Sequence, residues 1–269
     1  MQQKLEAIAA KLRQVNRVLF ITGAGISADS GLPTYRGVGG LYNTEKTEEG
    51  YPIEQCLSAT MFRTRPDITW KYMLLIGEAV MQCQPNPAHK IIAQWEKDFA
   101  QRSGKVVVFT QNIDGYHRLA GSENVLEIHG SLDELYCTKC TWKTLPDTSS
   151  EERLTEIKEL VNDSIPQCPR CGAVIRPRIV MFEEMLPRPV LQQFEEEFAH
   201  GNGFDIVFSI GTSAMFPYIT GPVYEAIRCG KTTVEINPTE GELSHRVTHY
   251  LPMGATEALT QLDALVRTV

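Results

Sequence analysis

The sequence predicts an α/β fold in which a doubly wound, Rossmann-like parallel sheet carries a smaller domain made of a zinc-ribbon insert and a helical insert. Three observations lead to this class. Short apolar runs of strand length alternate with helical stretches at both ends of the chain. A glycine-rich G-x-G-x-x-A segment directly follows the first apolar run. Two C-x2-C pairs interrupt the alternation in the middle of the chain.

The elements follow in order from the spacing of apolar residues. An amphipathic helix is expected first, because Leu5, Ile8 and Leu12 recur at helical spacing. Strands are expected at 18–21, 106–109, 206–210 and 233–236, with a shorter candidate at 125–128. Helices are expected at 87–99, 188–199, 217–228 and 255–267. Residues 41–85 turn from polar to helical, and 134–177 hold the cysteine pairs and a charged helix around 151–162.

These elements divide the chain into two predicted domains. Residues 1–40, 86–133 and 178–269 should form the Rossmann-like, nucleotide-binding domain. The helical insert at 41–85 and the zinc-binding insert at 134–177 should together form the small domain.

Charge and composition exclude several classes of protein. The net charge of the 269 residues is −7, with 26 Lys and Arg against 33 Asp and Glu, so no nucleic-acid partner is expected. No apolar run reaches the roughly 18 residues that a membrane helix needs, and the N-terminal stretch lacks the apolar core of a signal peptide. We therefore expect a cytoplasmic protein without a membrane partner, and a monomer is favoured.

The seven cysteines predict a metal site and not a disulfide framework. Two C-x2-C pairs, separated by 27 residues, offer four thiolates to one tetrahedral zinc ion with no position left open for catalysis, so we predict a structural zinc bound by Cys137, Cys140, Cys168 and Cys171. Cys56, Cys83 and Cys229 are expected to be free thiols.

The glycine-rich segment predicts a nucleotide site but not an ordinary dehydrogenase. Glycines at 23 and 25 permit a tight turn and a close approach to a pyrophosphate. A dehydrogenase also needs an acidic residue at the end of the next strand. Glu45, Glu48 and Glu49 fall instead in a polar stretch without strand character, whereas Asn237 ends a later strand and offers a ribose contact.

A second group of polar residues follows two other predicted strands. Gln111, Asn112 and Asp114 leave the carboxyl end of one strand, where α/β folds place ligands. His129 follows the strand at 125–128, and a histidine is the usual base for a hydroxyl proton near neutral pH. By itself, such a lone histidine is more often structural, which is the interpretation given to His89, His117, His200, His245 and His249.

The order of these motifs resembles the sirtuins, a family of NAD-dependent protein lysine deacylases, over essentially the whole chain. The matching segments are GAGISADSGLPTYRG, TQNID, EIHGS, the two cysteine pairs, GTS at 211–213 and EIN at 235–237. The resemblance implies NAD as co-substrate, one structural zinc and acylated-lysine proteins as partners. The residues that it implies for NAD binding are Gly23, Ala24, Gly25, Ser27, Asp29, Tyr35, Arg36, Gln111, Asn112, Ile113, Asp114, Gly211, Thr212, Ser213, Asn237, Gly254 and Ala255.

The resemblance also implies a role for the main residues. Gly23–Ser27 would hold the pyrophosphate, and Asp29–Arg36 would fold over the nicotinamide ribose, with Tyr35 where the family generally has Phe. Asp114 and Ile113 would bind the nicotinamide carboxamide. Gln111 and Asn112 would orient ribose hydroxyls. The acyl oxygen would attack the ribose as nicotinamide leaves, and His129 would then deprotonate the ribose hydroxyl that attacks the acyl carbon.

The substrate cleft is implied by RIVMFEEMLP, which resembles the family's V-x-F-G-E segment. Val180 would pair with the acyl-lysine backbone and Phe182 would line the tunnel. Glu183 replaces the usual glycine, which favours basic residues beside the acyl-lysine. The desuccinylase branch has Tyr and Arg where this chain has Met73 and Ile76, so uncharged acyl groups are expected.

Three alternatives remain open at this point. The same NAD cleavage serves a protein mono-ADP-ribosyltransferase. A desuccinylase is the alternative if the assignment of Met73 and Ile76 to the acyl pocket is wrong. A non-catalytic NAD- or ADP-ribose-binding module would be marked by loss of His129 or Asn112, and both are present.

Overall fold

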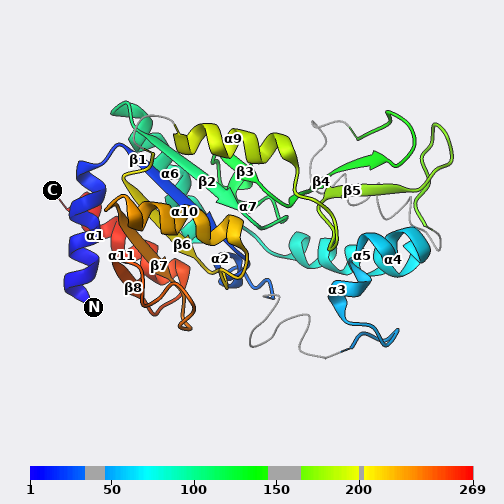
Figure 1. The fold of residues 1–269 in the computed structure, drawn as a ribbon, viewed down its shortest axis with the longest axis horizontal. Coiled ribbons are helices and arrows are strands. Elements are labelled where there is room, and N and C mark those ends of the chain that lie inside the picture. The colour runs from blue at the N-terminus through cyan, green and yellow to red at the C-terminus, as the bar shows by residue number, and fades with distance from the viewer. Residues whose placement is uncertain (34–45, 145–164, 200–202, 269) are drawn as a thin grey trace.

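A single parallel sheet of six strands forms one half of the computed structural model, which describes residues 1–33, 46–144, 165–199 and 203–268 (Figure 1). The strand order is β3-β2-β1-β6-β7-β8, and all neighbours are parallel. The order runs outward in both directions from β1 and β6, so the topological switch point lies between these two strands. The strands are β1 (Arg17–Thr22), β2 (Lys105–Thr110), β3 (Val125–Glu127), β6 (Ile206–Ile210), β7 (Thr232–Ile236) and β8 (His249–Leu251).

Helices cover both faces of this sheet because alternate side chains of each strand point to opposite sides. Val18 and Phe20 face the apolar cluster that includes α1 (Gln2–Gln14), α6 (Pro87–Gln101) and α11 (Ala255–Arg267). Leu19 and Ile21 face the cluster that includes α9 (Arg188–Ala199) and α10 (Pro217–Arg228). The predicted doubly wound class is therefore confirmed.

The other half of the molecule combines helices and a two-stranded sheet (Figure 1). It contains α3 (Ile53–Cys56), α4 (Ala59–Thr64) and α5 (Pro66–Gln82), beside the antiparallel strands β4 (Gly130–Cys137) and β5 (Ile175–Ile179). One apolar cluster joins the helices to the two-stranded sheet. Trp70 and Met73 from α5 lie in it with Leu135 from β4 and Ile175 from β5. The Trp70 indole N–H also donates to the Ile175 carbonyl at 3.0 Å. This shared core supports the predicted small domain, whose boundaries stay a prediction.

The helices expected at 188–199, 217–228 and 255–267 match α9, α10 and α11 residue for residue. The strands β4, β5 and β8 were not predicted, because none has a long apolar run. The charged helix expected around 151–162 lies outside the described residues. Within the described ranges, no helix combines the length and the apolar character needed to cross a bilayer.

Candidate active site

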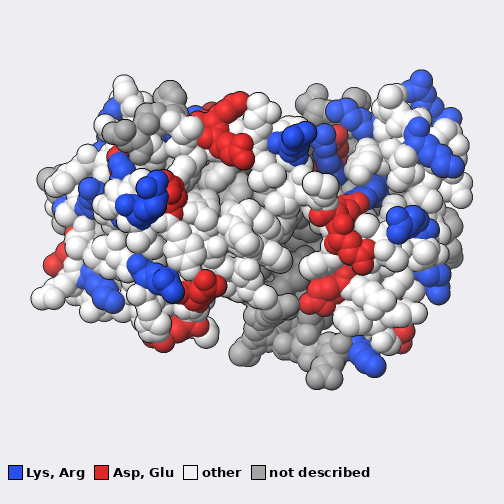
Figure 2. All heavy atoms as spheres, viewed as in Figure 1, with Lys and Arg blue, Asp and Glu red and all other residues white. Residues whose placement is uncertain are grey.

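Most of the predicted cofactor residues lie at one edge of the six-stranded sheet, where parallel strands end. Gly23 follows β1, Gln111 follows β2, Gly211 follows β6 and Asn237 follows β7. Short helices continue the chain after two of these ends, namely α2 (Gly25–Ala28) and α7 (Tyr116–Leu119). Figure 2 shows a hollow between the half with the sheet and the half with β4 and β5. The strand ends therefore meet where an α/β fold binds its ligand.

The loops after β1 and β6 touch through their glycines. A side-chain carbon on Gly25 would lie 2.5 Å from Gly211 Cα, and one on Gly23 would lie 2.8 Å from the Gly211 carbonyl oxygen. Gly211 has φ +59°, a conformation that glycine adopts without strain. The Gly25 N–H donates to the Gly211 carbonyl at 2.8 Å. These glycines therefore serve backbone-to-backbone packing, which sets the shape of the site.

Ser27 joins the ends of β1 and β2 in a buried polar group. Its hydroxyl donates to Asp114 Oδ2 at 2.7 Å, and the Asn112 amide donates to Ser27 Oγ at 3.2 Å and to the Gly23 carbonyl at 3.1 Å. Burial raises the pKa of Asp114, while hydrogen bonds from the Tyr116 N–H and from Ser27 oppose that rise. Asn112 and Asp114 thus lie side by side with fixed amide and carboxyl groups, as their predicted roles require.

Several of the remaining predicted cofactor residues are fixed by hydrogen bonds to other residues of the site. Gln111 donates to Thr212 Oγ1 at 2.8 Å, and Asn237 donates to the Thr212 carbonyl at 3.2 Å. Asp29 Oδ2 accepts the Thr256 N–H at 2.9 Å in the first turn of α11. Gly254 is adjacent, since a side-chain carbon there would lie 3.4 Å from the same Asp29 oxygen, and Ala255 begins the helix. Ala24 and Ile113 are half-buried, and Ser213 is exposed.

His129 is held by hydrogen bonds at both ring nitrogens. Nδ1 lies 2.9 Å from the Gln111 carbonyl oxygen, and Nε2 lies 3.0 Å from the Tyr218 hydroxyl. Burial lowers the pKa of His129, and the carbonyl of Gln111 opposes this shift. The imidazole is therefore neutral at neutral pH, which is the form that accepts a proton.

Gly130 makes this position of His129 possible. It has φ +75°, and a side-chain carbon there would lie 1.9 Å from the Arg178 carbonyl oxygen on β5. The His129 carbonyl next to it accepts the Val180 N–H at 2.8 Å. The segment after β5 that carries the predicted substrate residues is thus attached directly to the backbone of the predicted base.

The four predicted zinc ligands come together. Their sulfur atoms all lie within 4.8 Å of one another, with Cys137 and Cys171 Sγ at 3.4 Å and Cys140 and Cys168 Sγ at 3.6 Å. Backbone N–H groups of Lys139 and Cys140 both point at Cys137 Sγ at 3.3 Å. Four thiol donors this close together suit zinc, which takes four such ligands in structural sites. The other three cysteines are free, as predicted.

The predicted substrate segment after β5 is paired on one side with the loop before α4. The Phe182 N–H donates to the Leu57 carbonyl at 3.1 Å, and the Ala59 N–H donates to the Phe182 carbonyl at 2.9 Å. Phe182 remains 38% exposed, so its ring is accessible to a ligand. Glu183 has φ +72°, so the backbone keeps a conformation that favours glycine, and Glu183 Oε2 accepts the Thr60 N–H at 3.1 Å.

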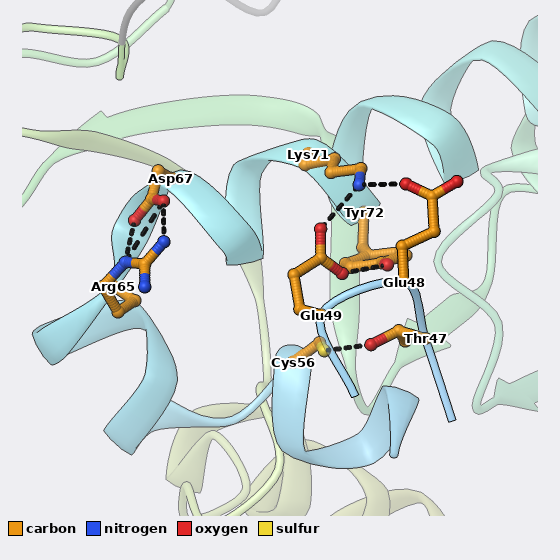
Figure 3. A network of polar contacts seen from close by, with 8 residues as sticks. All are labelled: Thr47, Glu48, Glu49, Cys56, Arg65, Asp67, Lys71 and Tyr72. Carbon is orange, nitrogen blue, oxygen red and sulfur yellow. Dashed lines mark hydrogen bonds and ion pairs between the residues drawn. The ribbon is translucent and has the colours of Figure 1, made fainter. Parts of the chain in front are cut away.

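Met73 and Ile76 lie on α5 in the apolar cluster of the smaller half, Met73 buried and Ile76 half-buried. The neighbouring Lys71 and Tyr72 of the same helix take part in a polar network with the segment before α3 (Figure 3). Lys71 Nζ lies 2.7 Å from Glu48 Oε2 and 2.5 Å from Glu49 Oε1, and Tyr72 donates to Glu49. Hydrogen bonds from Lys71 and Tyr72 lower the pKa of Glu49 to about 2. The segment at 46–51 is thereby attached to α5.

The structure thus gathers most of the predicted cofactor residues, His129 and the four cysteines into their expected groups. Tyr35 and Arg36 lie outside the described residues. The sequence analysis missed two residues that contact this site. Tyr218 begins α10 without any motif that points to His129, and the constraint on Gly130 depends on the path of β5.

Comparisons with known proteins identify the family of the chain. Residues 23–216 match the profile of the Sir2 family. The chain belongs to the Sir2 family. The sirtuin resemblance inferred from the motifs is therefore confirmed.

Individual Sir2 proteins match along nearly the full length. NAD-dependent protein deacylase 2 of Pseudomonas syringae pv. tomato is 44% identical over 256 residues, which cover 94% of this chain and 97% of that protein. The crystal structure of a Sir2 homologue–NAD complex is 30% identical, with a TM-score of 0.80 over 97% of this chain and 93% of that one. A Sir2–p53 peptide–NAD⁺ structure has a TM-score of 0.78 at 26% identity, over 96% of both chains.

Proposed function

We propose that this chain is an NAD-dependent protein lysine deacylase that transfers acetyl and other uncharged acyl groups from lysine to ADP-ribose. The observation that carries the proposal is the neutral imidazole of His129 at the same sheet edge as the buried Asn112 and Asp114. Full-length similarity to a bacterial NAD-dependent protein deacylase supports the same activity.

NAD binds at the strand ends as the co-substrate. It supplies the ribose carbon that takes the acyl oxygen as nicotinamide leaves. We assign the nicotinamide carboxamide to Asp114 and Ile113, because the Asp114 carboxyl is already aligned by Ser27 and the Tyr116 N–H. We assign the ribose hydroxyls to Asn112 and Gln111, whose side chains are fixed by hydrogen bonds. Fixed groups of this kind orient both reactants before reaction and reduce its entropy cost.

His129 is assigned as the general base. Its Nδ1 faces a carbonyl oxygen, which accepts hydrogen bonds and cannot donate them, so Nδ1 carries the proton and Nε2 carries the lone pair. The lone pair takes the proton of the ribose hydroxyl that attacks the acyl carbon. General-base help of this kind contributes about 10²–10⁴-fold to rate.

The acylated lysine is assigned to the hollow beside the segment after β5. An extended peptide there adds backbone hydrogen bonds with little demand on its sequence. We assign the Val180 carbonyl to the acyl-lysine backbone and the exposed Phe182 ring to the wall of the tunnel. Acidic side chains gather on one wall of the hollow (Figure 2). Together with the exposed Glu183, they support a preference for basic residues near the acyl-lysine.

The acyl chain is assigned to the wall formed by Met73 and Ile76. Both side chains are apolar and belong to a packed cluster, so a succinyl carboxylate placed there meets no cation from these two positions. Burying an unpaired carboxylate costs free energy, whereas an acetyl or butyryl group has no charge to remove from water. Uncharged acyl groups are therefore preferred.

The zinc ion, the location and the assembly complete the proposal. The four cysteines fill the tetrahedral shell of zinc, so the ion stabilises the smaller half and takes no part in the reaction. None of the seven cysteines is in a disulfide, which supports a reducing, cytoplasmic location. A monomer is the proposed assembly.

Mass spectrometry of one lysine peptide in acetyl, butyryl and succinyl forms, with and without NAD, tests the proposal. We expect NAD-dependent loss of the acetyl and butyryl groups, little loss of succinyl, and no loss with His129→Ala. Comparable removal of succinyl would overturn the assignment of Met73 and Ile76. NAD-dependent addition of ADP-ribose to the peptide without deacylation would establish a transferase instead, and bound NAD without turnover would establish a binding module.

A further inference from the structure

Tyr218 reaches His129 from a distant part of the chain. It lies in the first turn of α10, and its hydroxyl is 3.0 Å from His129 Nε2. Its ring stacks on Phe216, with ring centroids 5.3 Å apart and planes 11° apart. This stacking and the half-buried position hold the phenol in place. No other described contact uses the Tyr218 hydroxyl.

The direction of this hydrogen bond follows from the other ring nitrogen. The Gln111 carbonyl oxygen accepts at Nδ1, so the neutral ring carries its hydrogen there and its lone pair on Nε2. The Tyr218 hydroxyl must therefore donate to Nε2. Burial raises the pKa of Tyr218 to about 12, so the phenol keeps its hydrogen throughout the neutral range.

A hydroxyl that donates to Nε2 is also what the proposed reaction requires of the substrate. The ribose hydroxyl gives its proton to this lone pair, and its oxygen keeps the electron pair with which it attacks the acyl carbon. Tyr218 thus presents the same group, at the same atom, before the substrate arrives. Once Nε2 carries a hydrogen, the phenolic oxygen can accept it, because a tyrosine hydroxyl both donates and accepts.

We propose that Tyr218 is a positioning residue for the general base, and that its hydroxyl stands in for the substrate hydroxyl at His129 Nε2. This inference rests on the proposed function and adds a residue to it. In the free protein Tyr218 holds the imidazole in the tautomer and orientation that the reaction uses. The substrate hydroxyl then replaces the phenol at Nε2, and no proton is gained or lost by Tyr218 over the cycle.

The test uses the fact that nicotinamide release precedes the step that needs His129. Incorporation of labelled nicotinamide into NAD, in the presence of acetylated peptide, reports the earlier step, whereas formation of deacylated peptide reports the later one. We expect Tyr218→Phe to lower deacylation about tenfold, as loss of one hydrogen bond to a catalytic group does, and to leave nicotinamide exchange within about twofold. His129→Ala should show the same split with a larger loss of deacylation.

Tyr224→Phe is the matched control, because it removes a phenolic hydroxyl from the same helix. That hydroxyl donates to Glu242 at 2.7 Å, away from His129, so both rates should stay at the wild-type values. Equal loss of exchange and deacylation in Tyr218→Phe would show a merely structural role and overturn the inference, as would unchanged or faster deacylation. Wild-type protein that catalyses neither reaction would instead overturn the proposed function itself.

A second measurement does not depend on how the variant folds. The nitrogen chemical shifts of His129 in the wild-type protein without ligand distinguish the two neutral tautomers. We expect a hydrogen on Nδ1 and a hydrogen-bonded lone pair on Nε2. A hydrogen on Nε2 would make Tyr218 an acceptor in the neutral state and would overturn the inference.

Discussion

The hydroxyl of Ser27 donates to Asp114 Oδ2 at 2.7 Å, so the segments that follow β1 and β2 share one buried hydrogen bond. Asp114 is 9% exposed, and its other oxygen accepts the Tyr116 N–H at 2.9 Å. Ser27 also receives the Asn112 amide at 3.2 Å. A single small hydroxyl therefore aligns two of the residues assigned to NAD, Asn112 and Asp114.

The first prediction concerns this hydroxyl. Ser27→Ala should weaken NAD binding and lower the free energy of unfolding by about 1–3 kcal/mol, because the buried Asp114 carboxyl loses the donor at Oδ2 and keeps only the Tyr116 N–H at Oδ1. Calorimetric titration with NAD and urea unfolding measure the two effects. Ser244→Ala is the control, since it removes another buried hydroxyl that donates to a carboxylate, Glu235 Oε2 at 2.6 Å, outside this group. Equal loss of NAD affinity from both substitutions would contradict the special role of Ser27.

The second prediction concerns the pH dependence of the reaction. Burial lowers the pKa of His129, so the active neutral form persists below the ordinary histidine pKa of about 6.5. Activity is lost only as pH falls through the lowered pKa. The acid limb of the kcat/KM profile should therefore have its midpoint below about 6.5. A midpoint above 7 would be incompatible with a base held as the structure shows.

The third prediction concerns the metal. Cys171→Ser removes one of four thiol ligands, and the zinc content measured by plasma emission should fall from one per chain toward zero, with a lower Tm. Cys137 and Cys168 lie in the same apolar cluster as Met73, so the acyl wall should loosen with the metal site. Cys229→Ser, also at an exposed cysteine, should keep its zinc and its Tm. Full zinc content in Cys171→Ser would count against the four-thiolate site.

The fourth prediction concerns two buried histidines beside the site. Burial lowers the pKa of His89 to about 4 and lowers that of His117 well below its ordinary value. Below about pH 6.5 the unfolded chain therefore binds more protons than the folded chain. The free energy of unfolding should decrease as the pH falls. Between pH 7 and 5.5 the two imidazoles should cost about 2 kcal/mol of unfolding free energy.

Urea unfolding at several pH values in zinc-containing buffer measures this decline. His117→Gln keeps an amide near the partner of Nε2, Thr22 Oγ1, and should remove the part of the pH dependence that is due to His117. A stability that stays constant or rises over this interval would show that the folded protein admits the protonated imidazoles.

The framework of the fold could be predicted because its signals are local. Each predicted strand is a short apolar run, and each long helix of the sheet half has an apolar stripe that repeats at 3.6 residues. Because these strands are parallel, the polar residues that follow them had to meet at one edge. The convergence of Ser27, Asn112 and Asp114 follows from that geometry.

The rest could not be predicted because it depends on residues that are distant in sequence. Tyr218 is 89 positions from His129, and no motif around either residue indicates that the two are in contact. The sequence shows a glutamate at 183 but not its φ of +72° or its bond to Thr60. The sequence predicts a structural role for His117, but its contact with Thr22 depends on how the sheet packs and could not be predicted. The roles assigned to the site residues stay predictions until their variants are measured.

The glycine contacts have a consequence for engineering this protein toward other acyl groups. Gly25 and Gly211 exclude any side chain because each occupies the space that the other would need, and Gly130 excludes one because β5 passes directly over it. A mutant library that randomises the loops around the site should keep these three positions constant, since most of its members would otherwise fail before any new selectivity appears. The positions open to variation are on α5, at Met73 and Ile76, whose side chains pack in the apolar cluster of the smaller half.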